Sequence, residues 1–156
     1  MQLLSFTVAG EPYAIESRRV VEVLPLVAAR PIPRTPDYIR GLFTYRGALV
    51  PLIDLGRRLA DSPPTERLST RVIVVDAVPP GGRPGRLGLV AEHVISIVAA
   101  ERAEASLPPL ALDSAPFLGR LLRIEGRTVQ VIDVDRLLPA DIAAGLFPAP
   151  ASEAAS

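Results

Sequence analysis

A short arrangement of strand, turn, strand and helix occurs twice in this chain, and this repeat limits the fold more than any other feature. The first copy is IRGLFTYRGALVPLIDLGRRL at residues 39–59, and the second is GRTVQVIDVDRLL at residues 126–138. A shift of 79 positions aligns the glycine, apolar, aspartate and arginine positions of the two copies. The aligned pairs are Gly47 with Gly126, Val50 with Val129, Ile53 with Ile132, Asp54 with Asp133, Leu55 with Val134, Arg57 with Arg136 and Leu59 with Leu138.

Each copy has local signals for a hairpin followed by a capped helix. In the first copy, residues 42–45 and 49–53 predict strands because their apolar and aromatic side chains suit a half-buried pleated surface. Gly47 predicts the turn between them, since glycine takes positive φ without steric cost. Asp54 is placed to cap a short helix by accepting from its free N–H groups, and Asp133 holds the same position in the second copy.

The segments that precede the two copies also resemble each other, with a shift of 74 positions. Any two strand–aspartate–helix units look somewhat alike, but the two echoes come in the same order along the chain, which favours a true repeat. We therefore expect two small, similar, intertwined lobes within one domain at residues 1–147. The aligned pairs of this second echo are Tyr13 with Leu87, Ile15 with Leu89, Val20 with Val94 and Val23 with Ile97.

The remaining pattern predicts an all-β fold. About ten short runs of apolar or alternating residues are separated by glycine, proline and polar turns, which is typical of a sandwich or of a set of barrels. Two five-stranded barrels with short helices fit the repeat. The predicted strands are residues 3–8, 13–15, 20–26, 42–45, 49–53, 72–75, 87–90, 94–98, 117–124 and 128–132.

Other segments carry weaker signals. Thr35 followed by Pro36 predicts the start of one helical turn. Residues 101–116 are interrupted by proline and predict irregular structure, and residues 141–146 predict a final helical turn. Residues 148–156, PAPASEAAS, have no apolar side chains large enough to bury much surface, so a disordered tail is expected.

Composition excludes several classes of function. The 17 basic and 17 acidic residues give zero net charge, which argues against nucleic acid as a partner. There is no cysteine, so disulfides, thiolate catalysis and thiolate metal sites are ruled out. The N-terminus has no secretory signal pattern, and no apolar run is long enough to insert into a membrane. A cytoplasmic protein without a cofactor is expected.

No set of residues predicts an enzyme. His93 is the only histidine, and with no cysteine it cannot form a usual zinc site, so an ordinary polar role is expected. No nucleotide-binding glycine loop or nucleophile elbow is present. Asp54 and Asp133 could be imagined as paired catalytic carboxylates, but the helices that follow them explain both. The chain is therefore expected to have no catalytic residue and no bound metal.

One polar pair stands out among apolar neighbours. Glu22 lies within the strand predicted at residues 20–26, and Arg46 lies at the junction of a strand and a turn in the first repeat copy. The simpler interpretation is two unrelated surface charges. The alternative is a pair at the edge of a groove.

The chain resembles the chemotaxis coupling-protein family, which has the CheW-like fold. The most specific match is PRTPDYIRGLFTYRGALVPLIDLGRRL at residues 33–59, which holds the Ile-Arg-Gly, Arg-Gly and Pro-x-x-Asp-Leu elements typical of that family. Thr44 and Tyr45 replace the family's usual asparagine and leucine. Further matching segments, at residues 6–26, 71–77, 88–98 and 117–138, extend the resemblance over nearly the whole chain.

This resemblance implies two SH3-like five-stranded barrels around a common core. It also implies a non-catalytic adaptor that bridges the cytoplasmic tip of methyl-accepting chemoreceptors and the regulatory domain of a CheA-type histidine kinase, at membrane-associated receptor arrays. The residues implied for the receptor groove and its rim are Val20, Glu22, Val23, Arg46, Leu89 and Val94, and those implied for the kinase side are Gly41, Tyr45 and Gly47.

Several alternatives remain open from the sequence. The chain could serve a non-flagellar chemosensory pathway that controls surface behaviour, a second messenger or pili. It could compete for coupling sites without activating a kinase, or be a free-standing copy of a kinase's regulatory module. An enzyme with an unusual site is a further class, against which the lack of a histidine or cysteine cluster argues.

Overall fold

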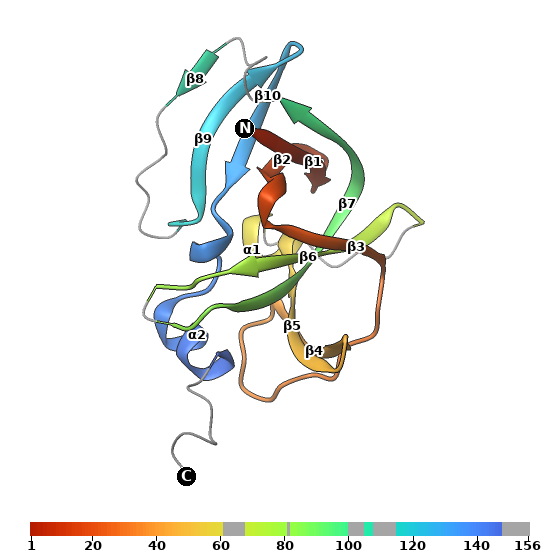
Figure 1. Ribbon diagram of the computed structural model, residues 1–156, viewed down its shortest axis with the longest axis vertical. Coiled ribbons are helices and arrows are strands. Elements are labelled where there is room, and N and C mark those ends of the chain that lie inside the picture. Colours follow the sequence, from red (N-terminus) through yellow and green to blue (C-terminus); the bar gives the residue numbers. More distant parts are fainter. Residues whose placement is uncertain (61–67, 81, 100–104, 108–114, 148–156) are drawn as a thin grey trace.

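The computed structural model describes residues 1–60, 68–80, 82–99, 105–107 and 115–147. Within these residues, ten strands form one branched hydrogen-bonded sheet, with short helices between them (Figure 1). The strands are β1 (Gln2–Val8), β2 (Glu11–Glu16), β3 (Val20–Pro25), β4 (Ile39–Tyr45), β5 (Ala48–Asp54), β6 (Thr70–Ala77), β7 (Gly85–Ala99), β8 (Ala105–Leu107), β9 (Leu118–Ile124) and β10 (Arg127–Ile132). The helices are η1 (Ser17–Arg19), α1 (Leu55–Ala60), η3 (Val134–Arg136) and α2 (Ala140–Leu146).

The sheet divides into two five-stranded halves that share the long strand β7. Lobe A, in the lower half of Figure 1, has the order β3-β6-β7-β5-β4 and uses the first part of β7. Lobe B, in the upper half, has the order β7-β1-β2-β10-β9 and uses the second part of β7, with β8 added beside β9. Each lobe therefore contains strands from both copies of the repeat.

The pairing of the strands agrees with the shifts of 79 and 74 positions found in the sequence. The parallel pair Leu52 and Gly88 in lobe A corresponds to Val131 and Ala14 in lobe B, through the shifts of 79 and 74. The antiparallel pair Val23 and Ile73 corresponds to Ile97 and Leu4, where the shift of 74 relates Val23 to Ile97 and the strand pairing alone relates Ile73 to Leu4. The repeat is therefore a structural pseudo-symmetry, in which β2 pairs with β10 in lobe B and the first part of β7 pairs with β5 in lobe A, so that these two strands exchange places between the copies.

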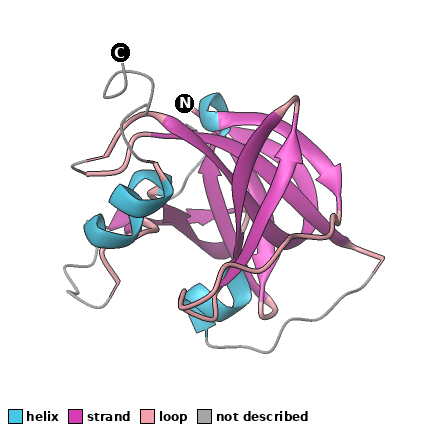
Figure 2. Ribbon diagram, turned by 90° about the horizontal axis from the view of Figure 1, so that it is seen from below, coloured by secondary structure: helices cyan, strands magenta, loops and turns pink. Residues whose placement is uncertain are grey.

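Three apolar clusters match this organisation. The largest draws on both lobes and on the helices, so it forms a shared core that includes Phe6, Ile53, Leu89 and Leu137. A second cluster fills lobe A around Phe43, and a third, smaller one fills lobe B around Leu122. Figure 2 shows the short helices at the margins of the curved strands. The all-β, CheW-like architecture expected from the sequence is confirmed.

Tight turns close the three two-residue hairpins. The pairs Ala9-Gly10, Arg46-Gly47 and Glu125-Gly126 all have positive φ at both residues, near 50° and 80°. This conformation suits the right-handed twist of the flanking strands, and glycine relieves its steric cost at the second position.

Asp54, the last residue of β5, and Asp133, which follows β10, each accept a backbone hydrogen bond from the helical turn that comes next. The Arg57 N–H donates to the Asp54 carboxylate over 3.3 Å, and the Asp135 N–H donates to the Asp133 carboxylate over 3.1 Å. The second helical segment is shorter than expected, a single 3₁₀ turn at Val134–Arg136. None of the helices in the described residues has the length and apolar character needed to cross a membrane.

The structure corrects several details. Neither half closes into a barrel, because no hydrogen-bonded pair in the described residues joins β4 to β3 or β9 to β7. The strands predicted at residues 87–90 and 94–98 are one continuous strand, which bends at His93, where φ is +47°. Residues 101–116 include the strand β8. Residues 36–39 form a single hydrogen-bonded turn, in which the Ile39 N–H donates to the Pro36 carbonyl, but the Thr35 hydroxyl donates to the Ile32 carbonyl. The predicted tail, 148–156, lies outside the described residues.

Candidate functional site

Glu22 and Arg46, which stood out in the sequence, lie together on lobe A. Arg46 occupies the first position of the β4–β5 turn, so its side chain leaves the end of the hairpin. Its Nη2 donates to Glu22 Oε1 over 3.1 Å, and the same carboxylate oxygen accepts from the Tyr45 hydroxyl. The Glu22 side chain on β3 is thus held from two directions by adjacent residues of β4 and its turn.

Tyr45 connects this surface pair to the interior. Its side chain is almost fully buried in the lobe A cluster, whereas the Arg46 side chain is 62% exposed and that of Glu22 is 40% exposed. Two guanidinium groups lie at cation–π distance from the centroid of the Tyr45 ring, that of Arg46 at 5.1 Å and that of Arg86 at 5.7 Å. The exposed side chains of Arg46 and Glu22 therefore both contact a tyrosine that burial keeps in place.

The sequence did not single out two residues at the edge of this cluster. Arg86 is the second residue of β7, and its Nε lies 3.4 Å from the carboxylate of Asp76 on β6. Arg86 is the last residue of the segment PPGGRPGR, which contained no sign that its side chain would lie over the ring of a tyrosine 41 positions earlier. We name Glu22, Tyr45, Arg46, Asp76 and Arg86 together the charged cluster.

The residues expected to line an apolar receptor groove do not share one surface. Leu89 is fully buried in the shared core, so it cannot line an open groove, which corrects the sequence expectation. The cause is that β7 is covered on both faces where it joins the lobes. Val20 and Val94 are half-buried against the same core, and Val23 is 39% exposed on β3, next to Glu22 in the chain.

The two glycines expected on the kinase side have different surroundings. Gly47 has φ of +81° and open space around its Cα, as the second residue of the Arg46 turn. Gly41 has φ of +138°, and a Cβ built there would lie 2.0 Å from the carbonyl oxygen of Arg30. Gly41 therefore has a structural role, because it allows residues 30–31 to lie directly against β4.

The charged cluster presents exposed ionic groups. No group of three or more metal-ligating side chains occurs in the part of the chain that the structure describes. His93, the sole histidine, lies 3.1 Å from the Thr7 hydroxyl on lobe B. An exposed ion pair such as Glu22–Arg46 adds only about 0–1 kcal/mol to stability. Its charges are therefore available to a partner at small cost to the fold.

The three tyrosines of the chain are all expected to resist ionisation in the native state. Burial first, and Glu11 second, raise the pKa of Tyr13, and burial is the main cause of the raised pKa of Tyr38. The hydrogen bond to Glu22 first, and burial second, raise the pKa of Tyr45. Above the unfolded value of about 10, the native chain then holds more protons than the unfolded chain, so stability falls as pH rises.

Absorbance of the ionised phenol, recorded against pH with and without urea, measures this effect. We expect the native titration to be shifted upward and the urea midpoint to fall above pH ~10. Coincident titrations of the native and unfolded chain would contradict the expectation.

These features define a class of protein, an all-β module of two intertwined lobes whose charged and aromatic side chains gather at the end of a hairpin. The family model for the CheW-like domain matches residues 2–141. The chain belongs to the CheW-like family, whose members are non-catalytic scaffold and adaptor proteins of chemotaxis signalling.

Individual proteins agree with this assignment. The chain is 28% identical over 144 residues to the chemotaxis protein CheW of Rhizobium meliloti, covering 90% of this chain and 88% of the relative. It is 31% identical over 116 residues to protein FrzA of Myxococcus xanthus, covering 73% of this chain and 68% of that protein. The crystal structure of the scaffolding protein TtCheW from Thermoanaerobacter tengcongensis superposes with a TM-score of 0.72, at 25% identity, over 88% of this chain and 87% of that one.

Proposed function

We propose that this chain couples methyl-accepting chemoreceptors to a CheA-type histidine kinase, as a non-catalytic adaptor in cytoplasmic arrays. The observation that carries the proposal is the charged cluster, in which Glu22 and Arg46 form an exposed pair on a buried tyrosine. Membership of the CheW-like family supports the same role.

The cluster suits recognition of a helical receptor tip. Arg46 can donate to an acidic side chain while it keeps its contact with the Tyr45 ring, because guanidinium groups form hydrogen bonds and stack at once. Glu22 is held in place by the Tyr45 hydroxyl, so less side-chain entropy is lost when a partner binds. Val23, exposed on the same strand, adds apolar surface for the non-polar side of a helix.

The kinase contact is proposed for the surface around the β4–β5 turn. Gly47 lies at this turn with open space around it, so a partner backbone can approach closely. Tyr45 is nearly buried and therefore acts through the position of its neighbours. Gly41 acts on this surface through the path of residues 30–31 along β4.

The test is Arg46→Ala, with thermal unfolding and binding to a receptor-tip fragment measured on one sample. We expect binding to weaken about tenfold, the size typical of one lost charge-assisted contact, while the melting temperature changes by no more than about 2 °C. Arg136→Ala is the matched control, since that side chain is 59% exposed and also ion-paired, at 3.6 Å to Asp133.

Unchanged binding by the Arg46 variant would count against the proposal. So would a loss of melting temperature large enough to explain the weaker binding, because Arg46 would then serve only to solvate and stabilise its turn.

A further inference from the structure

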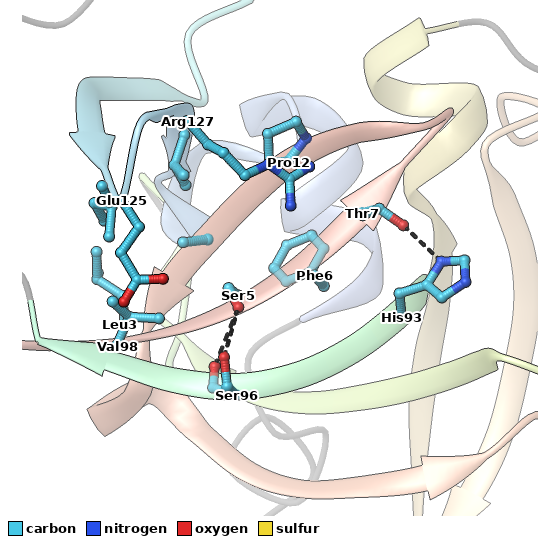
Figure 3. A pocket seen from close by; sticks show the side chains of 13 residues that line it. Leu3, Ser5, Phe6, Thr7, Pro12, His93, Ser96, Val98, Glu125 and Arg127 are labelled. Carbon is cyan, nitrogen blue, oxygen red and sulfur yellow. Dashed lines mark hydrogen bonds between the residues drawn. The ribbon is translucent and has the colours of Figure 1, made fainter.

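Lobe B contains a pocket at the place that corresponds to the charged cluster of lobe A. The pocket has a volume of about 230 Å³ and lies between β1, β2, the second part of β7 and the β9–β10 hairpin (Figure 3). Its interior is apolar and includes Leu3, Val98, Ile124 and Val129. Its mouth is exposed and includes His93, Ser96, Glu125 and Arg127.

Strand register establishes the correspondence. Tyr45 pairs with Ala48 at the end of the β4–β5 hairpin, as Ile124 pairs with Arg127 at the end of the β9–β10 hairpin. Glu22 pairs with Val74 across β3 and β6, and Ser96 pairs with Ser5 across β7 and β1 at the same place in lobe B. Likewise Arg86 pairs with Asp76, where Pro12 pairs with Thr7.

The pocket exists because lobe B has smaller side chains at these positions. Ile124 stands where lobe A has Tyr45, and Ser96 stands where lobe A has Glu22. In lobe A the side chain of Tyr45 belongs to the same buried cluster as Val50 and Val74. Lobe B keeps Val129 as the counterpart of Val50 but has Ile124 in place of the tyrosine ring, and Phe6 from β1 also lines the pocket.

We propose that this pocket receives a tyrosine side chain from a partner protein, which takes the place that Tyr45 fills in lobe A. A cavity of about 150 Å³ lined by apolar side chains is enough for a benzene ring, and this one is larger. Arg127 at the mouth supplies a cation for the ring face, as Arg46 and Arg86 do for Tyr45. Glu125 supplies a carboxylate for the phenol hydroxyl, as Glu22 does in lobe A.

The mouth favours a polypeptide over a free amino acid. Neither Glu125 nor Arg127 has an ion-pair partner among the described residues, so both charges are available. Figure 3 shows them on different sides of the pocket, Glu125 near Leu3 and Val98, and Arg127 near Pro12. A zwitterionic amino acid presents its ammonium and carboxylate from one carbon, and it fits this separated pair less well than a chain that crosses the mouth.

The other polar side chains that line the pocket already have hydrogen-bond partners within the protein. The Ser5 and Ser96 hydroxyls lie 3.3 Å apart, and the Thr7 hydroxyl lies 3.1 Å from His93 Nδ1 (Figure 3). These groups are satisfied without a ligand, so an apolar ring can enter without leaving unpaired polar atoms. The site goes beyond the proposed coupling role, since it lies on the other lobe and does not depend on Arg46.

The test is a titration of protein with ¹³C-labelled methyl groups, followed by NMR, with N-acetyl-tyrosinamide as the probe. We expect saturable shifts of the Val98, Ile124 and Val129 methyl signals with a dissociation constant near ~1 mM, which is usual for so small a ligand. N-acetyl-leucinamide, which lacks a ring, is expected to bind at least about threefold more weakly. Equal binding of the leucine and tyrosine amides would overturn the proposal.

Two variants and a control locate the site. Ile124→Tyr copies the lobe A residue and is expected to weaken probe binding at least about tenfold, by filling the pocket from within. Ser96→Trp, at an exposed position, is expected to do the same if the first variant fails to fold. Ile97→Trp is the control, because Ile97 is 59% exposed on the same strand and does not line the pocket.

Retained binding in both pocket variants would refute the site. Free tyrosine binding at least about tenfold more tightly than its amide would also overturn the proposal, because the occupant would then be the amino acid and not a protein side chain.

Discussion

Gly41→Ala is expected to remove about 3–5 kcal/mol of folding stability, close to the whole stability of a small domain. A Cβ at this position would lie 2.0 Å from the Arg30 oxygen and 2.5 Å from its carbonyl carbon. The backbone there also has φ of +138°, which side chains rarely tolerate. The clash cannot be relieved locally, because Arg30 and Leu42 exchange two backbone hydrogen bonds of 2.8 and 2.9 Å.

Urea unfolding followed by circular dichroism measures this loss, and Gly47→Ala is the matched control. Gly47 also has positive φ, +81°, but has nothing within 4 Å of a built Cβ. Its variant isolates the cost of backbone conformation, which we expect to be about 1 kcal/mol. Equal losses in the two variants would show that the approach of residues 30–31 to β4 contributes nothing.

Arg58→Ala is expected to cost about 2–4 kcal/mol, since Arg58 joins the two repeat copies. Its guanidinium carbon lies 4.8 Å from the Tyr38 ring and 4.6 Å from the Phe117 ring, and these two residues are related by the 79-residue shift. Its Nε donates to the Leu137 carbonyl over 2.7 Å. Burial lowers the pKa of Arg58, which agrees with a guanidinium partly removed from water between two rings.

Arg57→Ala, at the preceding residue, is the control for Arg58→Ala. The Arg57 side chain makes a single 3.4 Å contact with the exposed carboxylate of Asp37, so its loss should cost no more than about 0.5 kcal/mol. If the two variants unfold at the same urea concentration, the stacking of Arg58 on the rings of Tyr38 and Phe117 does not contribute to stability.

Local features of the fold could be predicted from the sequence because they depend on near neighbours. The Arg46-Gly47 turn and the helix-capping positions of Asp54 and Asp133 each need only a few residues to form. The repeat correctly predicted two similar lobes, because residues related by the sequence shifts occupy equivalent paired positions in the two lobes. The exchange of β2 and the first part of β7 between the copies could not be predicted, since both arrangements satisfy the same local pattern.

The candidate site was harder to predict from the sequence, because it depends on contacts between distant parts of the chain. Glu22 and Arg46 were singled out by residue type, yet their shared contact with Tyr45 depends on pairing between strands far apart in the chain. Leu89 was assigned to a surface groove from the family resemblance, and the sequence alone did not show that both faces of β7 are covered at this residue. The shifts of 74 and 79 already relate Ser96 to Glu22 and Ile124 to Tyr45, but the lobe B pocket was missed because only the folded strands show that Ser96 and Ile124 line one cavity.

Recruitment of the kinase to receptor-bearing membranes tests the coupling role most directly. Receptors and kinase from the same genome would be sedimented with and without this chain, and the pelleted kinase and its autophosphorylation measured. We predict that both rise when the native chain is present and that Arg46→Ala reduces the rise, while Arg136→Ala does not. Kinase that pellets equally without the chain, or pellets less in its presence as a competitor would cause, would contradict the account.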